Sequence, residues 1–411
     1  MAVVPGPGGL PHSSPHVPVA KGTNHAVDTP CVGAVHGAKA PVGKYYRPEL
    51  DWLRFIAFLA VFLSHAFPTA IQDYRAVGAP QSLAYFMALF FQTGAFGLDL
   101  FFALSSFLIT ELLLLEKGRT GNVHVKSFYI RRILRIWPLY FAFILTVCPF
   151  DVAFGKSPIL YYVAMLAFSG NWYNVFRSMG ASISFPLWSV SLEEQFYIVW
   201  PNLVRRTKPN RFAAIMVLIL ASTILYRSLF VYANPSDSIA VWFNTFTRLD
   251  AFALGGLLAW LLHNRSLTFS YAVRVCVLAT AAGLLWFVGT SPNGGHYGTS
   301  AVWAYPTVAL ASALCILAFV TAPPRHTYSK PFQILSYLGK ISYGLYVFHY
   351  AAIVFTRQVL PDGVVPDAWA WVCRAIIAAI VTLTVSMASY EFLEKPFLRL
   401  KRRFTYVESR P

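Results

Sequence analysis

Two ionisable residues, Arg54 and His65, lie inside the apolar run 51–68, DWLRFIAFLAVFLSHAFP. In a helix their spacing is three turns plus about 20°, so both side chains point to one side, about 16 Å apart along the axis. Ionisable groups inside a membrane helix are costly unless they face protein or water, which makes them functional candidates. Asp51, one turn before Arg54, could pair with it as a simple interfacial anchor. His65 is too short to reach the interface, which favours a chemical role such as general base.

The composition predicts an all-α polytopic membrane protein. Apolar residues make up 57% of the chain and charged residues only 12%, far from the average of soluble domains. Most apolar runs are long enough to cross a hydrocarbon core of about 30 Å as helices, and none has the alternating pattern of barrel strands. The candidate spans are 51–68, 97–115, 133–150, 158–169, 187–204, 212–232, 239–262, 270–289, 301–322, 341–357 and 367–392.

The net charge of +16 is spread over loops in a way that predicts topology rather than nucleic-acid binding. Excess Lys and Arg mark the cytoplasmic side. The basic clusters lie at 117–135, 205–211, around 265, at 325–330 and at 395–403. All of them are cytoplasmic only if an even number of crossings lies between the first two clusters. The eleven candidates then reduce to ten spans, and the one that does not span lies between residues 133 and 204. We therefore expect the short run 158–169 to be a re-entrant or interfacial segment, and both termini to be cytoplasmic.

Three parts follow from this pattern. Residues 1–44 are rich in Pro, Gly and His without periodicity, and we expect a disordered cytoplasmic tail. Residues 45–397 form the membrane domain, and residues 398–411 a basic cytoplasmic tail. No His or Cys spacing indicates a metal site. We therefore expect no metal and no tightly bound cofactor.

Further polar residues interrupt the apolar runs. Asp99 lies within the second run, and Arg248 and Asp250 lie together in another, next to a Gly pair. Adjacent carboxylates, Glu193 and Glu194, are hard to explain as packing, although the sequence does not tell which one is functional. A basic group, Arg131, Arg132 and Arg135, stands at the start of the run 133–150. Three guanidiniums at this spacing suit a phosphorylated ligand, while the simpler interpretation is a cytoplasmic anchor.

Six sequence motifs lie in order along the chain: YYRPELDWLRFIAFLAVFLSH, GLDLFFALSSFLI, RRILRIWPLY, LWSVSLEEQFYIVWP, LGKISYGLYVFHY and YEFLEKPF. The first, with its Arg-x10-His pair, resembles the opening motif of the integral-membrane acyltransferase family 3, which includes bacterial polysaccharide O-acetyltransferases. The other five resemble later motifs of the same family. Through these motifs Tyr197 and His349 join the candidate site residues. Ser106 replaces the usual Gly of the second motif, which puts local packing in doubt.

The resemblance implies transfer of an acyl group, often acetyl, from cytoplasmic acyl-CoA to a hydroxyl of a surface glycan or lipid-linked sugar. An acceptor hydroxyl needs a general base, which His65 could supply. Arg54 and the three arginines Arg131, Arg132 and Arg135 would bind the phosphates of the donor. The expected location is the cytoplasmic membrane, as a multi-pass protein in contact with lipid. Some members carry a hydrolase-like domain after the membrane part. We expect any such partner here to be a separate protein.

Two other functions compete with this one. A glycolipid transporter or flippase would use intramembrane Arg, His and Glu as a relay or binding site, but no repeat is visible. A membrane acyltransferase of a different fold would also use an intramembrane His. Transfer or hydrolysis of acyl-CoA by purified protein distinguishes the enzymes from the transporter.

Depth along the membrane predicts a partner for His65. In the ten-span topology His65 lies about 21 Å from the inner boundary, and Glu193 lies about 9 Å below the outer one. In a core of about 30 Å these depths coincide. A carboxylate beside the imidazole would orient it and raise its basicity. We therefore expect Glu193 to contact His65.

Overall fold

The computed structural model describes residues 46–177, 182–234, 239–263, 265, 267–323, 328–361 and 367–405. The tail expected over residues 1–44 lies outside these ranges. Every regular element of the described residues is helical, so the predicted all-α fold class is confirmed.

The helices are numbered along the chain. They are α1 (Pro48–Ala66), α2 (Ile71–Ala76), α3 (Gln81–Gly94), α4 (Gly97–Thr120), α5 (Val125–Ala153), α6 (Ile159–Leu166), α7 (Gly170–Phe176), η1 (Phe185–Leu187), α8 (Trp188–Arg206), α9 (Pro209–Ala233), α10 (Ala240–Phe243), η2 (Thr245–Thr247), α11 (Leu249–Leu262), α12 (Tyr271–Gly289), η3 (Pro292–Gly295), α13 (Ser300–Val320), α14 (Lys330–Lys340), α15 (Ser342–Val359), α16 (Asp367–Ser389), η4 (Tyr390–Glu394), α17 (Lys395–Lys401) and η5 (Arg402–Phe404).

Helix ends follow local sequence chemistry. Pro48 and Pro209 stand in the first turns of α1 and α9, where a missing N–H costs nothing and the fixed φ favours the helix. α4 ends at Gly121, whose φ of 74° is the left-handed conformation that glycine adopts without strain. Ser270 caps α12 by accepting a hydrogen bond from the Val273 N–H.

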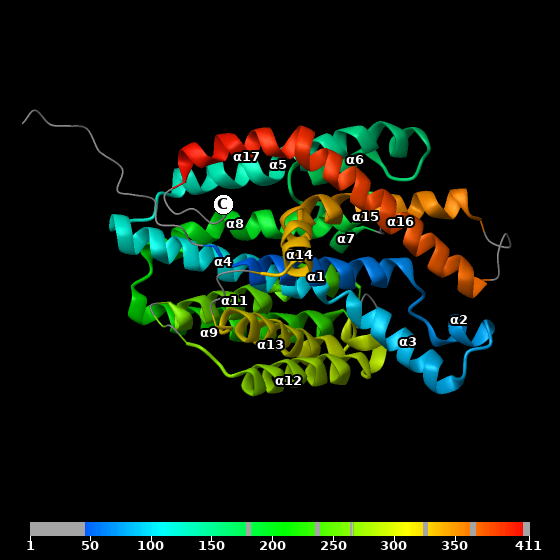
Figure 1. Ribbon diagram of the computed structural model, residues 1–411, viewed down its shortest axis with the longest axis horizontal. Coiled ribbons are helices and arrows are strands. Elements are labelled where there is room, and N and C mark those ends of the chain that lie inside the picture. The colour runs from blue at the N-terminus through cyan, green and yellow to red at the C-terminus, as the bar shows by residue number, and fades with distance from the viewer. Residues whose placement is uncertain are drawn as a thin grey trace, which may run out of the picture. The chain divides into compact units, whose positions relative to one another are not determined.

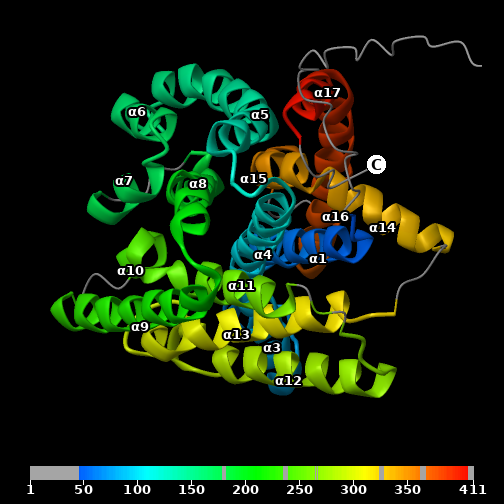
Figure 2. The same cartoon turned by 90° about the vertical axis from the view of Figure 1, so that its left-hand side faces the viewer.

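α1 and α4 lie at the centre of the bundle. Seen end-on, α9, α11, α12 and α13 lie on one side of this pair, α5 to α8 on a second, and α15 to α17 on a third (Figure 2). The long helices run side by side (Figure 1). α1 contacts α3, α4, α14 and α15 directly. Residues at successive turns of α1 therefore meet different neighbours.

α4 and α11 approach each other closely because small residues line their contact. A Cβ added at Gly255 would overlap the backbone of Ala103. Ser106, the unusual residue of the second motif, is fully buried and donates a hydrogen bond of 2.6 Å to the carbonyl of Phe252. The hydroxyl thus has a partner, and the serine fits its packed position.

α14 and α15 form a bent pair that turns by 72°. At the end of α14, Gly339 touches the backbone carbonyl of Asp51 in α1, so closely that any added Cβ would collide with it. This contact fixes the start of α15 against α1. From there α15 runs along α1 toward the end of α1 that carries His65.

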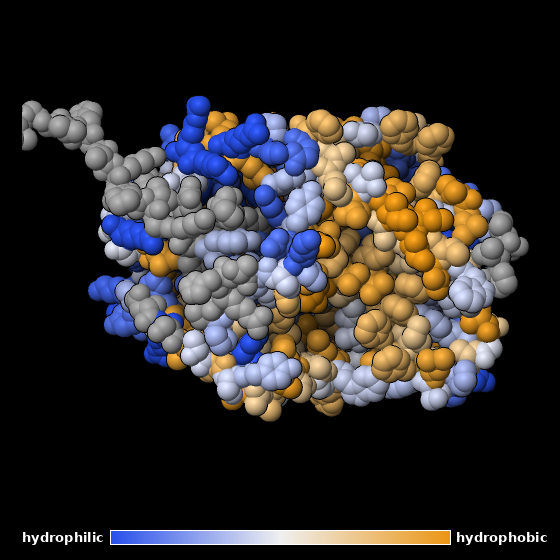
Figure 3. Space-filling view, viewed as in Figure 1, coloured by the Kyte–Doolittle hydropathy of each residue, from blue (hydrophilic) through white to orange (hydrophobic). Residues whose placement is uncertain are grey.

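Six helical stretches of the described residues are long and apolar enough to cross a membrane, and the bent pair α14–α15 gives a seventh. The protein is therefore a multi-pass membrane protein, but the predicted number of about ten spans is not confirmed. Three helices expected to span are not among these stretches. α1 and α8 carry several acidic and basic residues, and α11 has only 14 residues. Hydrophilic side chains gather where α17, the start of α5 and the end of α4 lie, and apolar ones cover α16 and α3 (Figure 3).

Two features expected from the sequence, the short run 158–169 and the domain boundary at residue 397, can be compared with helices of the structure. The run 158–169 contains α6, whose 8 residues rise about 12 Å, too short to cross a bilayer. This agrees with the expected interfacial segment. The boundary expected at residue 397 falls inside α17, because helical structure continues to Phe404. Residues 398–404 of the expected basic tail thus belong to the helical body.

Candidate active site

A cavity of about 460 Å³, here called the basic cavity, opens between α1, α4, α5, α14 and α17. Ten cationic and two acidic side chains line it. All four residues predicted to bind the donor are on its wall: Arg54, Arg131, Arg132 and Arg135. The other cationic residues are Arg47, Lys340, Lys395, Arg399, Lys401 and Arg402, and the acidic ones are Asp51 and Glu116.

Ion pairs hold parts of this wall in place. Arg54 pairs with Asp51 at 3.3 Å, which is the local pairing that the sequence left open. Arg131 pairs with Glu116 at 2.9 Å and donates a hydrogen bond of 2.8 Å to the carbonyl of Phe404. That second bond ties the C-terminal segment to α5. The cation excess of the cavity persists after both pairs are formed.

Arg132 is held differently, by aromatic faces. Its guanidinium carbon lies 4.8 Å from the ring centre of Tyr197 and 5.6 Å from that of Phe128. Stacking fixes the plane of the group without using its N–H donors. Among the residues that the structure describes, Arg132 forms no hydrogen bond, so its donors point to whatever enters the cavity.

Glu193 lies on the α4 side of α8, where it accepts a hydrogen bond of 2.8 Å from the Ser105 hydroxyl. Arg132 and Arg54 are the cations that act on it. Glu194 accepts a hydrogen bond of 3.1 Å from the Trp137 indole N–H. The two adjacent carboxylates therefore face different helices. Arg132 acts on both of them, and Arg54 acts on Glu193.

The predicted contact between His65 and Glu193 is wrong. The ring of His65 lies against those of His349 and Tyr350, with centres 5.5 Å and 5.3 Å away. No hydrogen bond or ion pair joins His65 to Glu193 within the described ranges. Equal depth was the basis of the prediction, but depth does not determine which way a side chain points around its helix. α15 occupies the space beside His65, and Glu193 turns toward α4.

The hydrogen bonds of His349 fix its tautomer. Nδ1 lies 2.6 Å from the carbonyl oxygen of Tyr346, and a carbonyl can only accept, so Nδ1 carries the proton. Neutral His349 then presents an unprotonated Nε2. This nitrogen is fully buried and has no hydrogen-bond partner among the described residues. A buried acceptor without a donor thus lies next to His65.

Residues at and just before the start of α8 form hydrogen bonds with α15, the helix that carries His349. The hydroxyl of Tyr346 donates to the carbonyl of Pro186 at 2.8 Å and lies 2.7 Å from the Ser189 hydroxyl. The two motifs around Glu193 and His349 therefore meet inside the bundle. Because α1 carries His65 and α15 carries His349, this contact also fixes α8 relative to the histidine pair.

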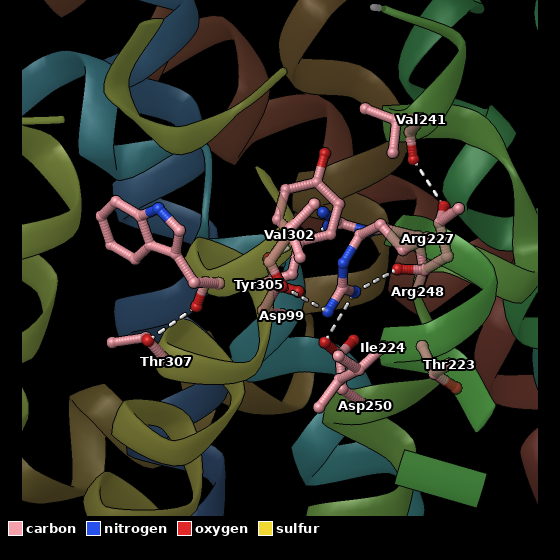
Figure 4. Close-up of polar contacts among 12 residues, drawn as sticks. Asp99, Thr223, Ile224, Arg227, Val241, Arg248, Asp250, Val302, Tyr305 and Thr307 are labelled. Atoms are coloured by element: carbon pink, nitrogen blue, oxygen red, sulfur yellow. Dashed lines mark hydrogen bonds and ion pairs between the residues drawn. The ribbon is translucent and has the colours of Figure 1, made fainter. Parts of the chain in front are cut away.

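The remaining candidates form a separate buried layer of ion pairs (Figure 4). Asp99 pairs with Arg248 at 3.0 Å, and Asp250 pairs with Arg227 at 2.8 Å; all four side chains are fully buried. The Arg248 guanidinium lies 4.2 Å from the Trp242 ring centre and 4.5 Å from that of Tyr305. Each charge has an opposite partner, which makes a structural role sufficient for this layer.

His296, in the loop between α12 and α13, borders this layer. Its ring stacks on Phe96 at 4.4 Å, and its Nε2 lies 3.1 Å from the Gln92 carbonyl. Burial lowers the pKa of His296 to about 4, and the charge of Arg248 acts in the same direction. His296 is therefore neutral near pH 7.

The sequence analysis missed several of these residues. Arg227 is a lone arginine in the apolar run 212–232, and the argument applied to Arg54 would have singled it out. The cations of α17 were interpreted only as a topology signal. Their place on the cavity wall depends on the fold of the C-terminal segment, for which the local sequence gives no signal.

Comparisons with known proteins agree with this arrangement. Residues 47–391 match the family described as an acyltransferase domain, the acyltransferase 3 family. The chain is similar to O-acetyltransferase OatA of Staphylococcus aureus (strain COL), at 27% identity over 370 residues, covering 85% of this chain and 57% of the relative. It is also similar to a putative O-acetyltransferase of Staphylococcus aureus (strain MSSA476), at 29% identity over 383 residues, covering 86% of this chain and 57% of the relative.

The chain thus spans about 57% of the length of the curated relatives it matches. No solved structure gives a significant match. The family match extends from Arg47, on the wall of the basic cavity, to Glu391, beyond both histidines. The chain therefore belongs to the integral-membrane acyltransferase 3 family.

Proposed function

We propose that the protein is an O-acyltransferase of the cytoplasmic membrane that moves an acetyl group from acetyl-CoA to a hydroxyl of a glycan or lipid-linked sugar. One observation carries this proposal: α1 bears Arg54 on the wall of the basic cavity and, about 16 Å further along, His65 beside His349. The proposed donor binding and the proposed proton transfer would then both involve residues of one rigid helix. The acetyl group is the choice that the names of the relatives support.

The basic cavity suits the donor. CoA carries a diphosphate and a further phosphate, and arginines bind such groups through paired, charge-assisted hydrogen bonds. A volume of about 460 Å³ is within the usual range for small-molecule sites. With the phosphates held by Arg132 and Arg135, the extended pantetheine arm would run along α1 toward His65. No tightly bound cofactor is needed for this chemistry.

His65 would act as the general base. Its imidazole takes the proton of the acceptor hydroxyl while the hydroxyl oxygen attacks the thioester carbonyl carbon. The carbon–sulfur bond then breaks, and the proton passes to the departing thiolate. The products are an ester and free CoA. General-base catalysis of this kind contributes about 10²- to 10⁴-fold in rate.

His349 supports the proposed base. If His65 directs an N–H toward Nε2 of His349, its other nitrogen is unprotonated and can accept the hydroxyl proton. Glu193 is not the partner of His65. We propose instead that Glu193, held by its hydrogen bond from Ser105 of α4, balances the positive charges of Arg54 and Arg132. This assignment replaces its predicted role in proton transfer.

The experiment separates binding from chemistry. Full-length protein in lipid nanodiscs is assayed for CoA binding and for transfer of labelled acetyl to membrane glycolipid. His65→Ala should leave CoA affinity unchanged and lower transfer by about 10²-fold or more. Arg132→Gln with Arg135→Gln should weaken CoA binding about tenfold or more.

Arg205→Gln with Arg206→Gln is the matched control, because both residues are basic and exposed but do not line the cavity. It should bind CoA as the wild type does. Full transfer activity of His65→Ala would contradict the proposed mechanism. Unchanged CoA affinity of the Arg132 and Arg135 variant would reduce that cluster to a topology signal.

A further inference from the structure

A second cavity, of about 370 Å³, lies at the other end of α1 and is here called the distal cavity. Its wall includes Ala66, Phe67 and Pro68, the three residues that follow His65. The other lining residues are Asp73, Ile353, Thr356, Arg357, Trp371, Arg374 and Ala375. None of them lines the basic cavity. Along α1, His65 therefore lies between residues that line two separate cavities.

The distal cavity is directly connected to the chemistry of His65. Ala66 is its immediate neighbour in the chain, and Arg357 lies two turns beyond His349 on α15. The charge of Arg357 acts on His65. A molecule bound in this cavity against Arg357 would thus be within reach of the proposed base.

The wall is ordered by contacts of its own. The Trp371 ring meets the edge of Tyr74 at 5.4 Å, and the Tyr74 hydroxyl donates a hydrogen bond of 2.7 Å to the carbonyl of Pro68. Arg374 donates through Nε to the carbonyl of Leu360 at 2.8 Å. Side chains held in this way lose little entropy when a ligand binds.

The arginines that line the distal cavity are not expected from the rule that Lys and Arg gather on the cytoplasmic side. Lys and Arg are expected mainly on the cytoplasmic side, where the basic cavity would lie. Here Arg357 and Arg374 both line a cavity at the opposite end of α1. Position on the cytoplasmic side does not explain Arg357, and a bound anion would account for it beside Asp73, the acidic residue of the same wall.

We propose that the distal cavity binds the acceptor, and that this acceptor is a sugar carrying an anionic group. The indole face of Trp371 suits the apolar face of a sugar ring. Arg357 would bind a carboxylate or phosphate of the sugar, and Asp73 would accept hydrogen bonds from its hydroxyls. This inference rests on the proposed function and adds the substrate class at the same site.

The experiment compares three acceptors that differ in charge. Full-length protein in nanodiscs receives labelled acetyl-CoA with methyl glucoside, methyl glucuronide or glucose 1-phosphate. The KM of at least one anionic sugar should be about tenfold or more below that of the neutral one. A lower KM for the glucuronide alone indicates a carboxylate, and for the phosphate alone a phosphate group. Arg357→Gln should abolish the preference, and Trp371→Ala should raise the KM for all three sugars.

Arg75→Gln is the matched control, because Arg75 is exposed on α2 near this end of α1 but does not line the cavity. It should keep the wild-type preference. Equal KM values for the three sugars in a wild-type protein that binds CoA would overturn the acceptor inference alone. So would a preference that survives in Arg357→Gln. A wild-type protein that binds no CoA would overturn the proposed function together with it.

Discussion

At the scale of single residues, the sharpest test of the histidine pair concerns Nε2 of His349, which has no hydrogen-bond partner among the described residues. Replacing His349 by Ala removes the acceptor beside His65 and should lower kcat about tenfold or more, with the KM for acetyl-CoA unchanged. His349→Gln returns an acceptor close to the position of Nε2 and should recover part of the rate. The pH dependence of kcat should shift in the Ala variant, which a merely structural role would not produce.

Non-additivity provides the control for this prediction. Adding His349→Ala to His65→Ala should cost little beyond the single His65 change, because residues that act as a unit are not additive. Independent losses in the double variant would show that His349 acts elsewhere. Transfer assays with the four proteins, wild type included, give the complete cycle.

His296 predicts a dependence of stability on pH. Its pKa is about 4 in the folded protein and about 6.5 when unfolded. A pKa lowered by folding means stability that is present above pH 6.5 and is lost as the pH falls toward 4. Between pH 7.5 and 5 this loss is about 2 kcal/mol. Chemical unfolding in detergent should show that His296→Gln lacks this part of the decrease. The same decrease in both proteins would contradict the assignment.

Residue types and helix periodicity predicted that Arg54 and His65 belong to one helix, and α1 contains both; their roles stay predictions. The partner of His65 could not be found in this way. Its identity depends on the direction of a side chain around α8 and on which helix fills the space next to α1. The depth of a residue along the membrane normal determines neither of these. Depth alone therefore predicts Glu193 as the neighbour of His65, whereas the structure has His349 of α15 there.

At the scale of elements, α17 contributes more than its length suggests. Lys395, Arg399, Lys401 and the following Arg402 lie on the wall of the basic cavity, and α17 contacts α5, which carries three arginines of the same wall. Arg399→Gln with Arg402→Gln should therefore weaken CoA binding about tenfold or more while the protein still inserts into the membrane. Isothermal titration with CoA measures this, again with Arg205→Gln and Arg206→Gln as the control. An unchanged affinity would limit the donor site to α1 and α5.

The run 341–357 shows what an element's sequence does and does not determine. Its apolar composition predicted a helix there, and α15 (Ser342–Val359) confirms it. The bend of 72° before it depends on a tertiary contact, the approach of Gly339 to the backbone of Asp51. That contact joins residues far apart in the chain, so no local pattern announces it. It nevertheless decides that His349 lies beside His65.

At the scale of the whole molecule, the two cavities give the bundle a direction. The basic cavity carries an excess of cations at one end, and the distal cavity opens at the other, with the histidine pair between them. A hydrophilic donor and a hydrophilic acceptor could then approach from opposite sides of the membrane. In the proposed mechanism the phosphates of CoA would not need to cross the bilayer, because only the acyl end of the donor would have to reach His65.

Sidedness is the last prediction. In a cysteine-free variant, single cysteines at Gln72 in α2 and at Thr299 before α13 should react with an impermeant thiol reagent in intact cells. A cysteine at Asn210, where α9 begins, should react only after the membrane is opened. All three positions are exposed. Thr299 is preferable to nearby Gly295, which is buried with a φ of 76° and would be strained by any side chain. Labelling of Asn210 in intact cells would place the basic cavity on the outer side, out of reach of cytoplasmic acetyl-CoA, and would contradict the proposed direction of transfer.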